Sequence, residues 1–225
     1  MSAFTTLVAR DIRLAARSGG GAALALGFFA LVATLVPLGI GADLNVLARV
    51  AGGVLWVGAV LAALLSLDRL FQGDYEDGSL DVIALSPLSL ESVSLAKMLA
   101  HFLSTGLPLT LVSPLLALLF NLPAPATLTL FLSLLIGTPA VSAVGAIGAS
   151  LTLSLKRGGL ILPLLILPLL APAVIFGSGA VSATLMGQSA MGGGDGLWLL
   201  LAFSAAACLL SPFAAAASVR LNLSS

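Results

Sequence analysis

The sequence carries very little charge for its length. It has nine basic and nine acidic residues among 225 positions, so only 8% of the chain is charged. A soluble domain carries about a quarter charged residues, and without them it would expose more apolar surface than a soluble monomer tolerates. Apolar residues make up 60% of the chain, and the mean hydropathy is +1.19. The composition therefore predicts an all-α membrane protein with no soluble catalytic domain.

Residues for catalysis and metal binding are also scarce. There is one cysteine, Cys208, which has no second thiol for a disulfide, and one histidine, His101. These two residues do not make a metal-ligand set, and the sequence has no G-x-x-x-x-G-K-[S/T] motif for nucleotide binding. The net charge is zero, which gives no overall field to attract nucleic acid. We expect a chain that is not an enzyme, with no firmly bound cofactor and no nucleic-acid partner.

Six apolar stretches are long enough to cross a bilayer, which takes roughly 17 to 25 residues. They cover about residues 21–40, 50–67, 98–119, 127–155, 160–177 and 197–219. With the N-terminus in the cytoplasm, the basic residues on the cytoplasmic side are Arg10, Arg13, Arg17, Arg69, Lys97, Lys156, Arg157 and Arg220. Only Arg49 falls outside. Because the Lys/Arg bias of short loops sets topology, both termini are predicted to be cytoplasmic.

The fourth stretch is too long for one straight span and contains Gly137, Thr138 and Pro139 in succession. We expect a tilted or kinked helix, with a re-entrant break at this point as the alternative. Prolines recur in the last four stretches, either as hinges or because membrane helices simply carry more proline. Small residues four apart, such as Gly145 and Ala149, predict close helix packing within the chain or in a dimer.

The N-terminal segment, residues 1–18, has the pattern of a short amphipathic helix. Arg10, Arg13 and Arg17 recur three to four residues apart, opposite an imperfect apolar stripe that includes Leu7. This pattern favours a basic helix lying among the membrane lipid headgroups on the cytoplasmic face. The alternative is a plain cluster of charges that only sets topology.

The longest polar stretch is the loop of residues 68–97, which holds most of the acidic residues. Gly78 and Pro87 interrupt it, and residues 79–85 are enough for a short helix. Ser89 has the type and position of an N-cap for a helix that runs into the third span. From this pattern alone, an ordinary solvated loop is the simpler interpretation.

The same loop carries three further elements in order: Asp68-Arg69, then Asp77-Gly78-Ser79-Leu80-Asp81, then Pro87-Leu88-Ser89 with Glu91 and Lys97. In these elements the chain resembles the ABC-2-type permease family. The resemblance implies an ABC-2 (type V exporter-like) permease fold of six transmembrane helices, with an N-terminal interfacial helix and a cytoplasmic coupling helix. The coupling helix would dock on a separate ABC ATPase subunit. The residues expected at that interface are Asp74, Tyr75, Glu76, Asp77, Gly78, Ser79, Leu80 and Asp81.

A second resemblance extends over nearly the whole chain. Its blocks include Pro37-Leu38-Gly39-Ile40-Gly41, Asp68-Arg69-Leu70-Phe71, Thr105-Gly106-Leu107-Pro108-Leu109, Leu135-Ile136-Gly137-Thr138-Pro139 and Leu210-Ser211-Pro212-Phe213. The chain is similar in these blocks to the haem exporter permease B family of cytochrome c maturation. This implies one transmembrane permease domain, residues 1–225, in the bacterial inner membrane, with haem as the candidate substrate and ATP acting only through a partner. The implied partners are the ATPase subunit, a second copy of the chain, haem-handling membrane subunits and a haem chaperone.

Within this interpretation two further features have expected roles. His101 is a candidate haem contact because imidazole can ligate haem iron, although it can also simply lie at the headgroup level near Lys97. The Gly-rich residues 178–196 are expected to form a periplasmic connector.

The expected function is to couple ATP hydrolysis to haem export or to release of the haem-loaded chaperone. Aromatic residues make up only 6% of the chain, which favours chaperone release over a haem conduit. A non-transporting scaffold for the haem-handling subunits and a single-chain secondary carrier are the alternatives.

Overall fold

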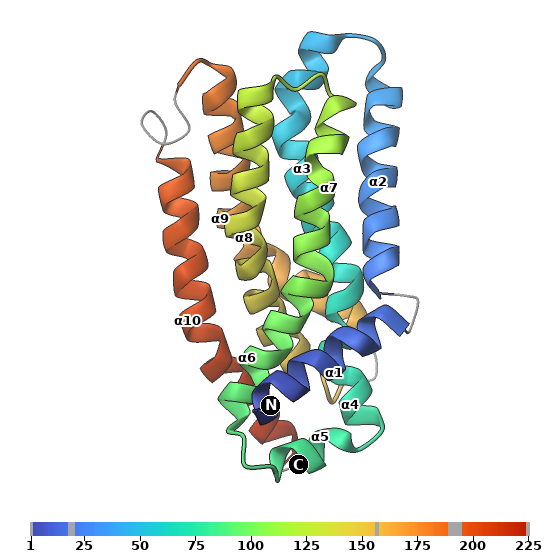
Figure 1. Cartoon of the computed structure of the whole chain (residues 1–225), viewed down its shortest axis with the longest axis vertical. Coiled ribbons are helices and arrows are strands. Elements are labelled where there is room, and N and C mark those ends of the chain that lie inside the picture. Colours follow the sequence, from blue (N-terminus) through green and yellow to red (C-terminus); the bar gives the residue numbers. More distant parts are fainter. Residues whose placement is uncertain (1, 18–20, 156–157, 189–194, 224–225) are drawn as a thin grey trace.

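The computed structural model describes residues 2–17, 21–155, 158–188 and 195–223. In these ranges the chain forms an elongated bundle of helices (Figure 1). Its long elements are α2 (Gly21–Ile40), α3 (Leu44–Leu67), α6 (Leu90–His101) continued by the π-helix η1 (Phe102–Gly106) and α7 (Leu107–Leu118), α8 (Ala124–Leu151), α9 (Gly158–Leu185) and α10 (Gly196–Leu223). Among the described residues, 6 helices are long and apolar enough to cross a membrane. The expected all-α fold with six transmembrane helices is confirmed.

Three short helices lie at one end of this bundle, where both termini are also found (Figure 1). α1 (Ala3–Arg17) crosses the ends of the long helices obliquely, α4 (Arg69–Glu76) follows α3, and α5 (Ser79–Ala84) follows α4. We name this end the charged end, and the opposite one, with the α2–α3 and α7–α8 connections, the far end. The basic residues of the described elements at the charged end include Arg10, Arg13, Arg69, Lys97 and Arg220, and Arg49 lies towards the far end. Lys156 and Arg157 lie outside the described residues.

Some predicted helix ends were wrong. α3 begins at Leu44, because Asp43 caps it by accepting hydrogen bonds from the backbone N–H groups of Asn45 and Val46. α9 continues to Leu185, so the connector predicted over 178–196 begins inside a helix. Glycine and serine near residue 177 look like a helix break in the sequence, but in the fold they allow neighbouring helices to approach.

The helix α8 is continuous through Gly137, Thr138 and Pro139, so the alternative of a re-entrant break at this point is wrong. The N-cap predicted at Ser89 is confirmed, since its side chain accepts a hydrogen bond from the Ser92 N–H and α6 runs on into the third span.

Close packing of small residues against large ones holds the centre of the bundle together. Trp56 of α3 is fully buried and donates a hydrogen bond from Nε1 to Ser133 Oγ of α8 at 3.0 Å. A Cβ added at Gly137 would lie 2.3 Å from the Trp56 ring, and one at Gly177 of α9 would lie 2.1 Å from it. The two glycines therefore form the slot that the indole occupies.

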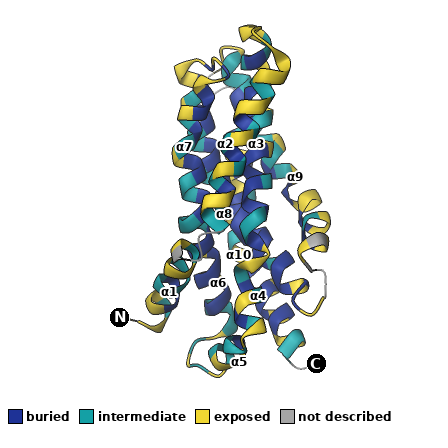
Figure 2. Cartoon of the chain, turned by 90° about the vertical axis from the view of Figure 1, so that its right-hand side faces the viewer, coloured by how far each residue is buried: buried dark blue, intermediate teal, exposed yellow. Residues whose placement is uncertain are grey.

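The small residues predicted to pack closely do so within the chain. Buried residues run along the inside of the bundle (Figure 2). Gly145 and Ala149 are buried, and a Cβ at Gly145 would lie 2.4 Å from the Leu67 side chain. These small residues of α8 are therefore used for packing inside the chain.

Candidate functional site at the charged end

The segment between α3 and α6 folds back on itself at a single glycine. Gly78 has φ +74, a left-handed conformation that glycine adopts without the steric cost other residues meet. The turn separates α4 from α5, and the backbone N–H of Ser79 donates to Asp77 Oδ1 at 2.8 Å. Hydrogen bonding by Ser79 lowers the pKa of the Asp77 carboxyl, so Asp77 remains charged at neutral pH.

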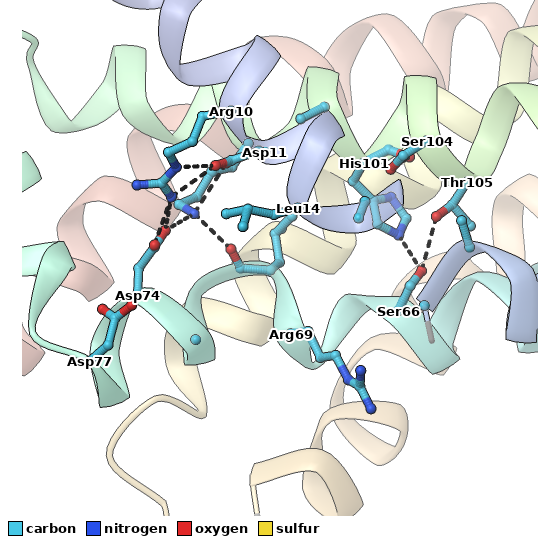
Figure 3. A pocket seen from close by; sticks show the side chains of 17 residues that line it. Arg10, Asp11, Leu14, Ser66, Arg69, Asp74, Asp77, His101, Ser104 and Thr105 are labelled. Carbon is cyan, nitrogen blue, oxygen red and sulfur yellow. Dashed lines mark hydrogen bonds and ion pairs between the residues drawn. The ribbon is translucent and has the colours of Figure 1, made fainter. Parts of the chain in front are cut away.

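Asp74 of α4 is the centre of a cluster of charges (Figure 3). Arg10 of α1 donates to both of its carboxylate oxygens, at 2.6 and 2.7 Å, and Lys97 of α6 also donates to Oδ2. The Ser79 hydroxyl donates to Oδ1 at 2.9 Å. Asp11 completes the group, since Arg10 donates to it at 2.9 Å and Lys97 at 3.3 Å. We name Arg10, Asp11, Asp74 and Lys97 the ion cluster.

The charges of the ion cluster are buried or partly buried, so each must keep a partner of opposite charge. The Lys97 side chain is only 2% exposed, and its ammonium also donates to the Leu70 carbonyl at 2.9 Å and lies 5.4 Å from the centre of the Phe71 ring. A charge buried in this way must be paired, because removing its partner leaves an uncompensated charge at low dielectric. For Arg10, burial opposes the charge, but the carboxylates of Asp11 and Asp74 outweigh it and raise the pKa of the guanidinium.

The structure separates the residues predicted to contact an ATPase into three groups by their burial. Asp74 and Leu80 are buried, 9% and 1% exposed, so their side chains are held inside the chain by the ion cluster and by apolar packing. Glu76, Asp77 and Asp81 are exposed, while Tyr75, Gly78 and Ser79 are partly buried.

Two apolar residues beside these acids lie in the predicted coupling region but were not singled out as interface residues in the sequence. Val82 is 70% exposed and Leu85 89% exposed. The available signal was apolar residues at the C-terminal end of a short helix in an acidic loop. We name Glu76, Asp77, Asp81, Val82 and Leu85 the outer face of the loop.

The helix predicted near the N-terminus is present as α1, but its surroundings are more specific than a lipid surface. Leu7 and Val8 are buried in a small core with Val93, Ala96 and Ala100 of α6. Arg10, expected among lipid headgroups, instead turns inward to Asp74 because that buried carboxylate needs a partner. Arg13 is exposed, and nothing is described of the Arg17 side chain.

His101 lies at the end of α6 and is 4% exposed. Its Nε2 is 3.0 Å from Ser66 Oγ of α3, and its Nδ1 is 2.8 Å from Ser142 Oγ of α8. The imidazole thus links three helices. Direct ligation of haem iron would require one ring nitrogen to leave its hydroxyl partner, and the predicted haem contact at His101 stays a prediction.

We expect His101→Asn to lower the free energy of unfolding by about 1 kcal/mol, because hydrogen bonds between membrane helices contribute about 0.6 kcal/mol each. Thermal unfolding of the purified protein in detergent measures this. The matched control is Ser104→Ala, because the Ser104 hydroxyl donates only to the His101 carbonyl. Equal stabilities of the two variants would contradict the linking role.

A cavity of about 300 Å³ lies between α1, α2, the α3–α4 junction and α6–η1. The ion cluster forms one of its ends and Ser66, His101 and Thr105 form the other (Figure 3). The cations of the cluster are neutralised by Asp11 and Asp74, so the cluster itself offers this cavity no excess positive charge.

Comparison with known proteins assigns the family. The family model described as CcmB protein matches residues 2–222. The chain belongs to the CcmB family. Relatives of this CcmB-family chain are named "Heme exporter protein B". The protein from Rhodobacter capsulatus is 54% identical over 217 residues, covering 96% of this chain and 98% of the relative.

Two other relatives carry the same name. The protein from Pseudomonas aeruginosa is 49% identical over 220 residues, covering 98% of this chain and 97% of the relative. The protein from Escherichia coli K12 is 43% identical over 214 residues, covering 95% and 96%. Family membership and six apolar helices together identify a multi-pass membrane protein with a permease fold.

Proposed function

We propose that this CcmB-family chain is the membrane subunit of an ABC transporter of the bacterial inner membrane that serves haem handling in cytochrome c maturation. A separate subunit would hydrolyse ATP, and the charged end with both termini would face the cytoplasm. The haem assignment rests on the names of the relatives. The orientation rests on the excess of arginine and lysine at the charged end among the described residues.

The observation that carries the proposal is the outer face of the loop. Val82 and Leu85 are exposed at the charged end, beyond the ion cluster and next to three exposed acids. Buried apolar anchors supply much of the energy of an interface, and complementary charges around them fix its specificity. The expected surface on the ATPase subunit is therefore an apolar groove with basic residues at its rim.

We expect the triple variant Glu76→Lys, Asp77→Lys, Asp81→Lys to weaken ATPase binding by about tenfold, because like charges would then face each other across the interface. The measurement is ATPase activity and P-loop subunit recovered with the tagged chain from membranes of the native host. Asp195→Lys, at an exposed position towards the far end, is the control. Full recovery of the ATPase by the triple variant would refute the docking site, provided that the variant itself reaches the membrane in normal amount.

Packing between Trp56 and His101 leaves no passage for haem at this point of the bundle, which favours chaperone release over a haem path between these helices. The space between Trp56 and His101, lined also by Thr138 and Ser142, is too small to hold a water molecule in this conformation. A porphyrin ring is far larger.

An ATPase-dead complex that still supports cytochrome c maturation would instead favour the scaffold alternative.

A further inference from the structure

The ion cluster joins α4 and α5, which carry the outer face of the loop, to α1 and α6. Asp74 lies on α4, and its partner Ser79 is the first residue of α5. Its other partners come from elsewhere in the chain, Arg10 from α1 and Lys97 from α6. The carboxylate of Asp74 on α4 thus contacts side chains of three other elements at the charged end, α1, α5 and α6.

These contacts are short and resist separation. Nη2 of Arg10 donates to both oxygens of Asp74, and hydrogen bonds between two charged groups are stronger than those between neutral groups. Lys97 is almost completely buried, so moving Asp74 away from it would leave a charge without its main partner. A displacement of α4 and α5 therefore either carries α1 and α6 with it or breaks buried ion pairs.

The helix that Lys97 belongs to has a natural place to bend. α6 ends at His101 and is followed at once by the π-helix Phe102–Gly106. Such segments have a looser hydrogen-bonding pattern than an α-helix and are frequent at functional sites. Below this segment, α6 packs against α1 through Val93, Ala96 and Ala100. The ion cluster thus ties α1, α4, α5 and α6 to one another, and η1 is the point at which α6 joins the rest of the third span. α6 also contacts α10 through Met98 and Glu91.

We propose that Asp74 is a positioning residue that ties the outer face of the loop to α1 and α6, so that movement of α5 by the bound ATPase subunit is passed to the third transmembrane span. The inference rests on the proposed function. It adds that binding of the ATPase subunit can be separated from the coupling of ATP hydrolysis to cytochrome c maturation. The outer face of the loop provides the binding, and the ion cluster provides the coupling.

The test neutralises the buried pair as a unit. In Asp74→Asn with Lys97→Met, no buried charge is left alone, because Arg10 and Asp11 still neutralise each other at 2.8 Å. We expect the purified complex to retain its ATPase subunit and ATP hydrolysis within about twofold, while cytochrome c matured per ATP hydrolysed falls about tenfold, a common size for coupling between sites. Asp74→Glu with native Lys97 should restore most of the coupling.

The matched control removes an ion pair at the same end that does not touch α1 or α4. Glu91 of α6 and Arg220 of α10 lie 2.5 Å apart, and the Arg220 side chain is 57% exposed. Glu91→Gln with Arg220→Gln should leave both ATP hydrolysis and maturation per ATP unchanged. If this control pair and the cluster pair lower coupling equally, the effect is not specific to Asp74 and the proposal is wrong.

A second variant decides the matter if the first does not assemble. Arg10→Gln with Asp11→Asn removes only the charged contacts of α1 and leaves Asp74 paired with Lys97. Normal ATP hydrolysis with reduced maturation per ATP would support the proposal, and normal maturation would overturn it.

A direct readout is the distance between spin labels at Arg13→Cys in α1 and Gly73→Cys in α4, in a Cys208→Ala background. A Cβ at Gly73 meets no atom within 4 Å, so a label there is tolerated. We expect one narrow distance that does not change through the ATP cycle, and a broad or ATP-dependent one after neutralisation of the pair. If the distance between these two labels changes with ATP while the ion cluster is native, the linked movement of α1 and α4 is overturned.

The two proposals fail in different ways. If the triple variant of the outer face keeps its ATPase subunit, the proposed docking function is wrong. If that variant loses the subunit while the cluster variants mature cytochrome c normally per ATP, the docking function stands and the positioning role of Asp74 is wrong.

Discussion

Gly177→Val is expected to destabilise the bundle by about 3 kcal/mol or more, at the upper end of what overpacking of a core costs. The new Cβ would lie 2.1 Å from Trp56 Cε2, a distance at which either the ring or helix α9 must move. The ring has little room to do so. It is fully buried, its Nε1 donates to Ser133, and Gly137 of α8 touches its other edge. Thermal unfolding of the purified protein in detergent measures the loss.

The matched control lies two residues further along the same helix. A Cβ at Gly179 meets no atom within 4 Å, so Gly179→Val should change stability little. Trp56→Phe should recover part of the loss in Gly177→Val because the smaller ring leaves space for the valine. In a Trp198→Phe background, Trp56 fluorescence should shift to the red when the slot is disrupted. Equal stability of the variants at 177 and 179 would show that the slot does not exist.

Val82→Asp with Leu85→Asp is expected to abolish recovery of the ATPase subunit. Truncating an apolar anchor of an interface costs about 2 kcal/mol or more, so that replacing two anchors lowers affinity by several hundredfold. Both side chains are exposed in the isolated chain, so these changes should leave its own stability almost unaltered. Quantitative recovery of the ATPase at several tagged-chain concentrations, with the amount of folded chain measured in parallel, gives the result.

Salt distinguishes the apolar anchors from the acidic residues around them. Charges at the rim of an interface act mainly on the rate of association and are screened by salt. The salt dependence of ATPase binding should therefore differ between the native chain and the triple variant at Glu76, Asp77 and Asp81. The Val82 and Leu85 variant should bind poorly at every salt concentration. As a control, Leu14→Asp alters another exposed leucine of the charged end, outside the outer face. ATPase recovery that survives at Val82 and Leu85 would show that the loop is not the docking site.

The spans of this chain could be predicted because lipid imposes a simple rule on the sequence. A helix that crosses a bilayer needs a long apolar run, and the run of residues 21–40 coincides with α2. The N-cap at Ser89 was also predictable, since a cap depends only on neighbouring residues. The end of α9 was not, because Gly177 has no local reason to remain helical. In the fold α9 continues through this glycine, and the missing Cβ leaves the space that Trp56, far away in sequence, occupies.

The candidate site also combines features that the sequence predicts with features that only the fold decides. The sequence by itself allowed a short helix in the acidic loop, with a solvated loop as the simpler interpretation, and favoured an amphipathic helix near the N-terminus, because both patterns depend on residue order within a few turns. Only the tertiary structure decided that Asp74 and Arg10 face each other while Asp77 and Asp81 face outward. Residues 10, 74 and 97 are brought together by three separate helices, and the free energy of a buried charge depends on partners that sequence distance does not reveal.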